Sequence, residues 1–225
     1  MSGEDIYDIF AVHYGHHDRP AADNYIGGDT HDNQPLDYYV WAIVGANKTF
    51  VLDTGFDEAM GKKRKRNLVR PIADGLKAAG VDPAGVEDVI LSHLHYDHSG
   101  NHDAFPRARY HVQDAEMAYA TGRCMCHGFL KTPFEEEDVV AMVRKLYAGR
   151  VKFHDGASEL APGVTVHKIG GHSKGLQCVR VKTRRGYVVL ASDCTHLYRH
   201  FETGRVFPTT YNPAEVVEGY DTLRR

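Results

Sequence analysis

The stretch HLHYDH at residues 93–98 puts three histidines and one aspartate within six positions, directly after an apolar run. A strand alternates its side chains, so His93 and His95 are expected to point the same way. Asp97 and His98 would then lie in the tight turn that Gly100 ends. Imidazole and carboxylate groups are ligands that zinc and iron prefer. The pattern predicts part of a metal site, and the alternative is a surface loop that holds these residues by coincidence.

A metal site needs further ligands from distant segments, and two other loops offer them. His172 stands in GGHSKG after an expected strand at 164–169, and Asp193 follows an expected strand at 187–192. Loops at strand ends commonly carry functional residues. A carboxylate at position 193 has the chemistry to bridge two metals. Taken alone, His172 is also consistent with an ordinary loop residue, and Asp193 with a helix cap or turn residue.

Strands and helices alternate along the chain in a way that favours helices covering sheets in one domain. Runs rich in aromatic and β-branched residues predict strands, at 7–15, 36–45, 48–55, 86–92, 108–113, 150–154, 164–169, 178–183 and 187–192. Apolar residues spaced three to four apart predict a helix over 68–79, and capping signals support further helices. These lie at 114–121 with Asp114 as N-cap, at 134–149, and at 212–225 with Asn212 as cap and Pro213 at the first position.

Composition narrows the function classes. The formal net charge of −3 gives no electrostatic reason to expect nucleic acid or an anionic membrane as partner. No run approaches the roughly 18 apolar residues that span a bilayer, and the first ten residues lack the features of a secretory signal. With four cysteines, a cytoplasmic protein with reduced thiols is expected. The basic run KKRKR at 62–66 predicts a solvated loop, with an anion-binding patch or a nuclear signal as alternatives.

The motifs resemble those of the metallo-β-lactamase-fold superfamily. HLHYDH matches its His-x-His-x-Asp-His signature, GGHSKG its Gly-His loop, SDCTH its bridging-aspartate strand end, and VLDTG at 51–55 its Asp-Thr-Gly turn. Within the superfamily the chain is most similar to the N-acyl homoserine lactonase family. Three stretches carry this similarity: YGHHDRPAADNYIGGD, QDAEMAYATGRCMCH and SDCTHLY.

The resemblance implies an α+β fold, an αββα sandwich of two mixed β-sheets flanked by helices, with a site for two zinc ions at the sheet edge. Iron, cobalt or manganese are alternative metals. Asp53 would orient a ligand from outside the coordination sphere. The implied ligands are His93, His95 and His172 for one metal, Asp97 and His98 for the other, and Asp193 as the bridge.

Two departures from the family pattern bear on the second metal and on catalysis. The family supplies a further histidine well after the bridging aspartate, whereas here the last histidine is His200. We therefore expect one domain over residues 1–225 that ends short of the family's C-terminal part, with His196 or His200 as substitutes for that ligand. The family also places a tyrosine three residues after the bridging aspartate, and this chain has His196 there. His196 would polarise the carbonyl or protonate the leaving group, with Tyr198 as an alternative and an ordinary turn residue as the structural explanation.

The expected function is metal-dependent hydrolysis of a lactone, with N-acyl homoserine lactone as the implied substrate, attacked by a metal-bound hydroxide. Asp97 or His196 would protonate the leaving alkoxide. Met117, Tyr119 and Phe129 would line an acyl pocket or belong to the core, and the histidines at 13, 16, 17 and 31 would border the cleft or lie on the surface. The resemblance also suggests a homodimer. The alternatives are thioester or phosphodiester hydrolysis, mononuclear-iron persulfide oxidation, or a truncated, non-catalytic metal-binding domain.

Overall fold

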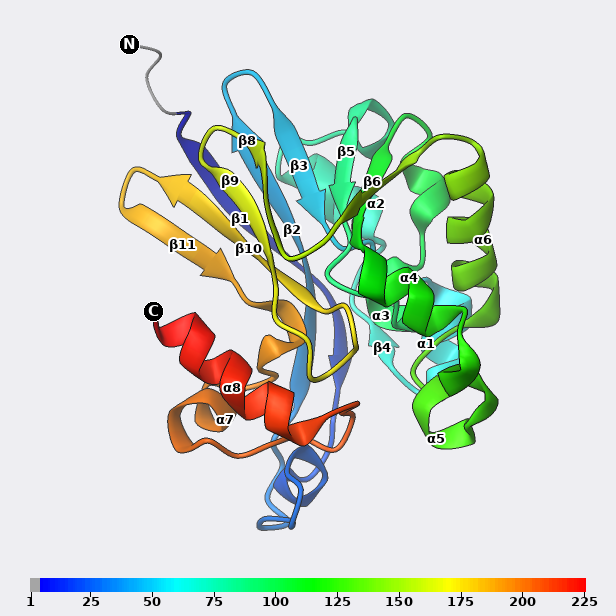
Figure 1. Ribbon diagram of the computed structural model, residues 1–225, viewed down its shortest axis with the longest axis vertical. Coiled ribbons are helices and arrows are strands. Elements are labelled where there is room, and N and C mark those ends of the chain that lie inside the picture. The colour runs from blue at the N-terminus through cyan, green and yellow to red at the C-terminus, as the bar shows by residue number, and fades with distance from the viewer. Residues whose placement is uncertain (1–4) are drawn as a thin grey trace.

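Two β-sheets face each other with helices on their outer sides (Figure 1), in a computed structural model that describes residues 5–225. The αββα sandwich expected from the sequence is therefore confirmed. The expectation of two mixed sheets holds only for the larger one, because every strand pair in the smaller sheet is antiparallel. The larger sheet has the order β4 (Asn67–Leu68), β1 (Tyr7–His17), β2 (Leu36–Gly45), β3 (Thr49–Leu52), β5 (Asp88–Ile90), β6 (Arg109–Gln113) and β7 (Val151–His154). The smaller sheet has the order β11 (Gly186–Leu190), β10 (Gln177–Thr183), β9 (Val164–Lys168) and β8 (Ala157–Ala161).

The strand directions bring several chain segments to one edge of the larger sheet. β1 pairs antiparallel with β2 and β4, and β2 pairs antiparallel with β3, whereas β3, β5, β6 and β7 are parallel to one another. The carboxyl ends of parallel strands meet at the same edge. Asp53 follows β3 directly, and the HLHYDH stretch follows β5 within three residues. Residues forty positions apart therefore share one end of the sandwich.

Two apolar cores hold the layers together. Between the sheets, Ile43, Phe50 and Leu52 pack with Val166 and Val179 of the smaller sheet, all fully buried. A larger core lies between the seven-stranded sheet and its helices. Burial of large aliphatic and aromatic side chains stabilises such layers by roughly 1.5–3 kcal/mol each. The two cores fix the sheets and thereby the loops at their ends.

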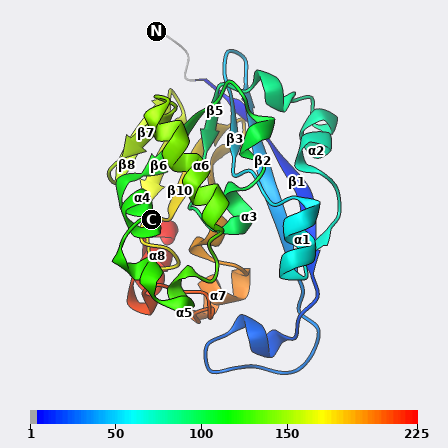
Figure 2. The ribbon, with the colours of Figure 1, turned by 90° about the vertical axis from the view of Figure 1, so that its right-hand side faces the viewer.

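Residues 5–225 form eight α-helices, and Figure 2 shows their arrangement from a second side. They are α1 (Glu58–Arg64), α2 (Ile72–Ala78), α3 (Tyr96–Ser99), α4 (Asp114–Ala120), α5 (Gly128–Lys131), α6 (Glu136–Tyr147), α7 (Tyr198–Thr203) and α8 (Pro213–Arg224). No helix in the described part of the chain is long and apolar enough to cross a membrane. The first four residues, on which the prediction of no secretory signal partly rests, lie outside the described residues.

The basic run was expected to be a solvated loop, and for residues 62–64 this is wrong. They form the last turn of α1, which begins where the Asp57 carboxylate accepts a hydrogen bond from the Met60 N–H at 2.7 Å. Such a cap satisfies an N–H that otherwise lacks a partner. Lys65 ends the helix in the left-handed conformation with φ 56°. Capping at both ends thus decides this helix, which lies against β4.

Three smaller details of the secondary structure also differ from expectation. Leu68 belongs to β4, which pairs with β1, so α2 begins only at Ile72. Gln113, and not Asp114, is the N-cap residue of α4, because the strand β6 runs straight into the helix. β8, α5 and α7 were not expected. The C-terminal helix is confirmed, with the side-chain oxygen Oδ1 of Asn212 accepting a hydrogen bond from Ala214 N at 3.1 Å.

Candidate metal centre

Two loops converge at one end of the sandwich and bring His93, His95 and His172 together. One ligand atom from each lies within 4.8 Å of the other two. The Nε2 atoms of His93 and His172 are 3.1 Å apart, although 79 positions separate them in sequence. All three side chains are buried. β5 ends at Ile90, so the loop that follows it, and not strand alternation, aims the rings of His93 and His95 at a common point.

Asp193 lies between this group and a second one. Its Oδ2 is 3.2 Å from Nε2 of His172 and 3.5 Å from Nε2 of His98. His98 and Asp193 also form a group with His93 whose ligand atoms lie within 4.8 Å of one another. A carboxylate oxygen between two imidazole groups is the arrangement expected of a bridging ligand. Asp193 thus lies within reach of both groups of imidazoles, and its role as a bridge stays a prediction.

The donor set fits a metal in chemistry and spacing. Tetrahedral nitrogen ligands at the usual zinc distance of about 2.1 Å lie about 3.4 Å apart, close to the separations of 3.1–3.5 Å between these donors. His172 donates from Nδ1 to the carbonyl of Thr209, and His98 lies 2.8 Å from Asp53 through Nδ1. These outer hydrogen bonds leave the Nε2 lone pairs free to face the cluster.

Asp53 anchors the loop that carries the predicted ligands. Its two carboxylate oxygens accept hydrogen bonds from Ser92 N at 2.7 Å and Ser92 Oγ at 2.9 Å, besides the contact with His98. The residue is 2% exposed and has a positive φ of 64°. A non-glycine residue in this region is strained and is held there by its surroundings. The contacts of Asp53 are those expected of a residue that orients a ligand.

Asp97 lies at the margin of the cluster. Its Oδ2 is 3.7 Å from Nε2 of His98, and it joins none of the three-residue groups found within residues 5–225. Tyr14 fixes its backbone by donating a hydrogen bond of 2.6 Å to its carbonyl. Burial, reinforced by the nearby charge of Asp193, raises the pKa of the Asp97 carboxyl. Asp97 is thus the most loosely placed of the predicted ligands.

The charges at the site are strongly coupled. Burial lowers the pKa of His93 and His95 well below the ordinary histidine value, and neighbouring imidazoles lower it further. Burial would do the same at His98, but the carboxylates of Asp193, Asp97 and Asp53 raise its pKa well above that value. Divalent cations bind neutral imidazoles and ionised carboxylates, so metal binding would release the proton that the raised pKa keeps on His98.

His196 faces the cluster, whereas His200 does not. Nε2 of His196 is 3.1 Å from Asp193 Oδ2, and its ring stacks on Phe207 with centroids 3.8 Å apart. His200 is buried with Nε2 2.7 Å from the carbonyl of Asn24. Its other nitrogen accepts a hydrogen bond from Leu197 N at 3.1 Å. Because both ring nitrogens are engaged, the expectation that His200 substitutes as a ligand is wrong, and His196 alone remains in reach.

Glu116 is a residue of the site that the sequence did not reveal. It is fully buried on α4, and its carboxylate accepts hydrogen bonds from Leu94 N at 2.9 Å, Gly175 N at 2.8 Å and the hydroxyl of Ser173. It therefore ties the loop of His93 and His95 to the loop of His172. A glutamate in the first turn of a helix is common on surfaces, so nothing in the sequence distinguished this one.

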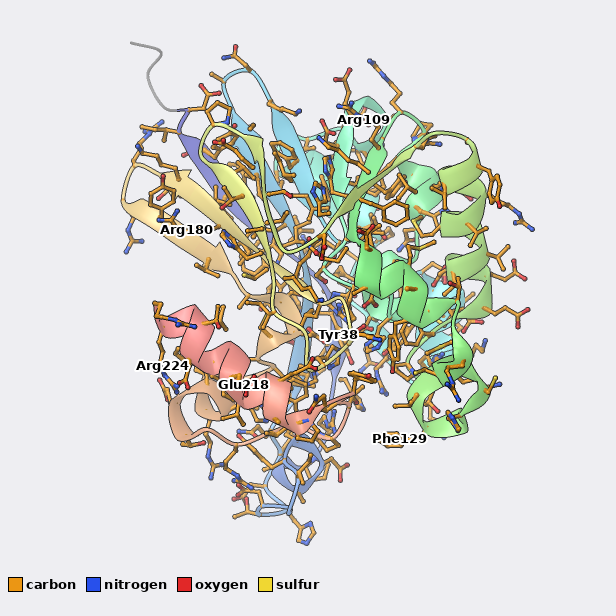
Figure 3. The ribbon with its side chains drawn as sticks, viewed as in Figure 1. Tyr38, Arg109, Phe129, Arg180, Glu218 and Arg224 are labelled. Carbon is orange, nitrogen blue, oxygen red and sulfur yellow. The ribbon has the colours of Figure 1, made fainter. Side chains whose placement is uncertain are left out.

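A cavity of about 810 Å³ opens beside the cluster. Tyr119 and Phe129 line it, as does Tyr198, whereas Met117 is packed in the core. Phe129 is 73% exposed and projects from α5 towards the side of α8, and Tyr38 lies near the centre of the molecule (Figure 3). The cavity joins the predicted ligands to an aromatic wall, which suits a partly apolar substrate.

Comparisons with known proteins agree with this architecture. The sequence profile of the Metallo-beta-lactamase superfamily matches residues 34–221. The N-acyl homoserine lactonase AiiB of Agrobacterium fabrum is 29% identical over 127 residues, 55% of this chain and 46% of that protein. AiiB of Rhizobium rhizogenes is 28% identical over 177 residues, 71% of this chain and 63% of that protein. The chain thus spans about half the length of the first of these relatives.

Solved structures share the fold. An N-acyl homoserine lactone hydrolase with N-hexanoyl-L-homoserine bound at its catalytic metal centre aligns with a TM-score of 0.78 and 20% identity, covering 100% of this chain and 88% of that one. AidC, a dizinc quorum-quenching lactonase, aligns with a TM-score of 0.72 and 16% identity, covering 98% of this chain and 86% of that one. At these identities the likeness concerns the fold alone.

The two-sheet sandwich and the histidine–aspartate cluster at its end define a protein of the αββα class with a candidate metal site. The profile match extends over most of the chain and includes every predicted ligand. The chain belongs to the metallo-beta-lactamase superfamily.

Proposed function

We propose that the protein is a metal-dependent hydrolase that opens a lactone ring, with N-acyl homoserine lactones as the first substrates to test. The names of the curated relatives support the substrate class. The convergence of His93, His95 and His172 with Asp193 carries the proposal. We further propose that residues 5–225 act as a single domain, because the two sheets share one core.

The proposed ligands are those on which the geometry and the family motif agree. His93, His95 and His172 would hold one zinc ion, and Asp193 would bridge to a second. His98 and Asp97 would hold the second ion, with Asp53 fixing the ring of His98. When bound, such ions supply Lewis acidity and lower the pKa of water from about 16 towards 7.

The chain's own side chains would handle the protons. His196 presents Nε2 to the cluster beside Asp193, so a proton on this atom lies within reach of a substrate oxygen. Asp97, with its carboxyl beside His98, is the second candidate donor to the alkoxide that leaves when the ring opens. Phe207 stacks on the His196 ring and would keep it aimed at the reacting carbonyl. Donors positioned in this way typically contribute about 10²–10⁴ in rate.

Metal analysis and a lactone panel test the proposal. Purified protein should contain about two metal ions per chain and acidify a weakly buffered solution of N-hexanoyl homoserine lactone. The same panel should include an aliphatic lactone, a thioester and a phosphodiester. His172→Ala should lose both metal and turnover, and Glu218→Ala, an exposed change on α8, should retain both. One iron per chain with oxygen consumption, and no lactone turnover, would instead favour persulfide oxidation.

A further inference from the structure

The cavity beside the metal centre has a second polar region, on the side of β1 and β4. Arg19, Arg66, Tyr38 and Tyr96 line it, and we call these four residues the basic subsite. β1 pairs with β4 through His16 and Asn67, so Arg66 comes to lie beside the end of β1. Nη1 of Arg66 is 3.1 Å from Nε2 of His17. Strand pairing thus places two guanidinium groups, far apart in sequence, in one wall of the cavity.

No carboxylate within residues 5–225 forms an ion pair with Arg19 or Arg66. Arg66 donates instead to neutral acceptors: the Tyr96 hydroxyl at 3.2 Å and the carbonyl of Arg64 at 2.8 Å. Arg19 donates to the carbonyl of Asp23, whose carboxylate acts on it only at longer range. A third cavity arginine, Arg64, differs because Glu135 pairs with it at 3.4 Å. The positive charge of Arg19 and Arg66 is therefore not neutralised by a direct partner.

Buried donors without acceptors gather at the same place. Nε of Arg19, Nε of Arg64 and Nδ1 of His17 are all buried and have no hydrogen-bond partner among residues 5–225. Most buried polar groups in proteins are hydrogen-bonded, and a cluster of exceptions requires an explanation. Burial, together with the charges of Arg66 and Arg19, lowers the pKa of His17 to about 4. Burial is the largest cause of this shift, and the two arginine charges add to it.

We propose that Arg19 and Arg66 bind a carboxylate of the substrate, so that the preferred lactone carries an acidic group distant from its ring. Guanidinium groups bind carboxylates through strong, charge-assisted hydrogen bonds. One cavity contains both the basic subsite and the predicted metal ligands, so one molecule can reach both. The anion site stands on the arginines alone, whereas its link to a lactone rests on the proposed function.

Anion binding can be measured without any turnover. Metal-free protein of residues 1–225 is titrated calorimetrically at pH 8 with glutarate, and with glutaramide as the uncharged control. Glutarate should bind saturably and more weakly at high salt, and glutaramide should not bind. Arg66→Gln and Arg19→Gln should each weaken glutarate binding roughly tenfold or more, as loss of a charged hydrogen bond predicts. Arg66→Lys should retain part of the binding if positive charge is what matters.

Arg180→Gln is the matched control. Arg180 lies on β10 in the other sheet, exposed and stacked 3.4 Å from the Tyr187 ring centroid, and Figure 3 shows it far from Tyr38. This variant removes the same charge but should bind glutarate like the unmodified protein. Equal binding by Arg66→Gln and Arg180→Gln, or no glutarate binding at all, overturns the proposal. Circular dichroism checks that each variant is folded, and Arg19→Gln loses only one backbone contact.

A pair of lactones then separates this inference from the proposed function. The two acyl chains are identical except that one ends in a carboxylate and the other in a carboxamide. KM should be lower for the acid, and Arg66→Gln should raise it roughly tenfold for the acid alone. Arginine-dependent glutarate binding without lactone turnover would refute the lactonase and keep the anion site. Turnover that ignores the terminal charge would refute the role of the two arginines in substrate binding and keep the lactonase.

Discussion

Replacing Glu116 tests whether one buried carboxylate holds the two ligand loops together. In Glu116→Ala the N–H groups of Leu94 and Gly175 lose their acceptor, and the Ser173 hydroxyl must turn elsewhere. Each buried backbone donor left unpaired costs about 1–3 kcal/mol, so the free energy of unfolding should fall by roughly 2–6 kcal/mol. For a chain of this size 1 kcal/mol lowers Tm by about 2–4 °C. The expected fall in Tm is thus at least about 4 °C.

The same change should weaken metal binding, because the loops of His93 and His172 would no longer share an anchor. Loss of an outer contact to metal ligands typically costs roughly 10–100-fold in affinity. Competition with a chromophoric zinc chelator measures this loss, and differential scanning calorimetry measures Tm. Glu116→Gln keeps one acceptor oxygen and should fall between Glu116→Ala and the unmodified protein. If Glu116→Ala melts and binds zinc like Glu218→Ala, the anchoring role is refuted.

Three further changes probe the site and its surroundings. His172→Ala should reduce the amount of bound metal, measured by atomic emission. A chelator should then no longer lower the Tm of this variant. An undiminished metal content would contradict the ligand assignment. Asp53→Asn replaces an anionic acceptor of His98 with a neutral amide and should weaken zinc binding about tenfold or more, read by chelator competition, with equal affinity as the opposing result. Burial lowers the pKa of His200 from its ordinary value of 6.5 to about 4. Between these two pH values the unfolded chain therefore binds more protons than the folded chain. The free energy of unfolding should decrease as the pH falls from about 7 towards 4. His200→Gln should flatten this dependence of Tm on pH, and an unchanged slope would refute the contribution of His200.

The basic run at residues 62–66 shows which features follow from the local sequence and which depend on long-range strand pairing. Five consecutive charged residues suit a solvated loop, and Lys62 and Lys65 are indeed exposed. Arg66 instead lines the cavity because β4 pairs with β1. No local sequence signal marks a strand as short as the two residues of β4. Nor does one show where the side chain of the preceding residue, Arg66, points. The same run therefore contains solvated side chains and a wall of the predicted substrate cavity.

The sequence by itself determined those features that depend on neighbours along the chain. The spacing of HLHYDH, the strands at 36–45 and 164–169, and the Asn212 cap of α8 follow from periodicity and capping, which act over a few residues. Resemblance to a known family supplied His172 and Asp193 as partners of that motif. Physical reasoning on the residues alone left both open, because a loop histidine looks the same whether or not another loop approaches it.

Only the tertiary structure decided which distant groups meet. Parallel pairing of β3 with β5 brings Asp53 to His98, and the approach of α4 brings Glu116 to the backbone N–H groups of both ligand loops. The same packing turns His200 towards Asn24 while leaving His196 beside Asp193. Sheet order and layer packing set these contacts by burying apolar surface over the whole domain, a sum over many residues that no short stretch of sequence contains.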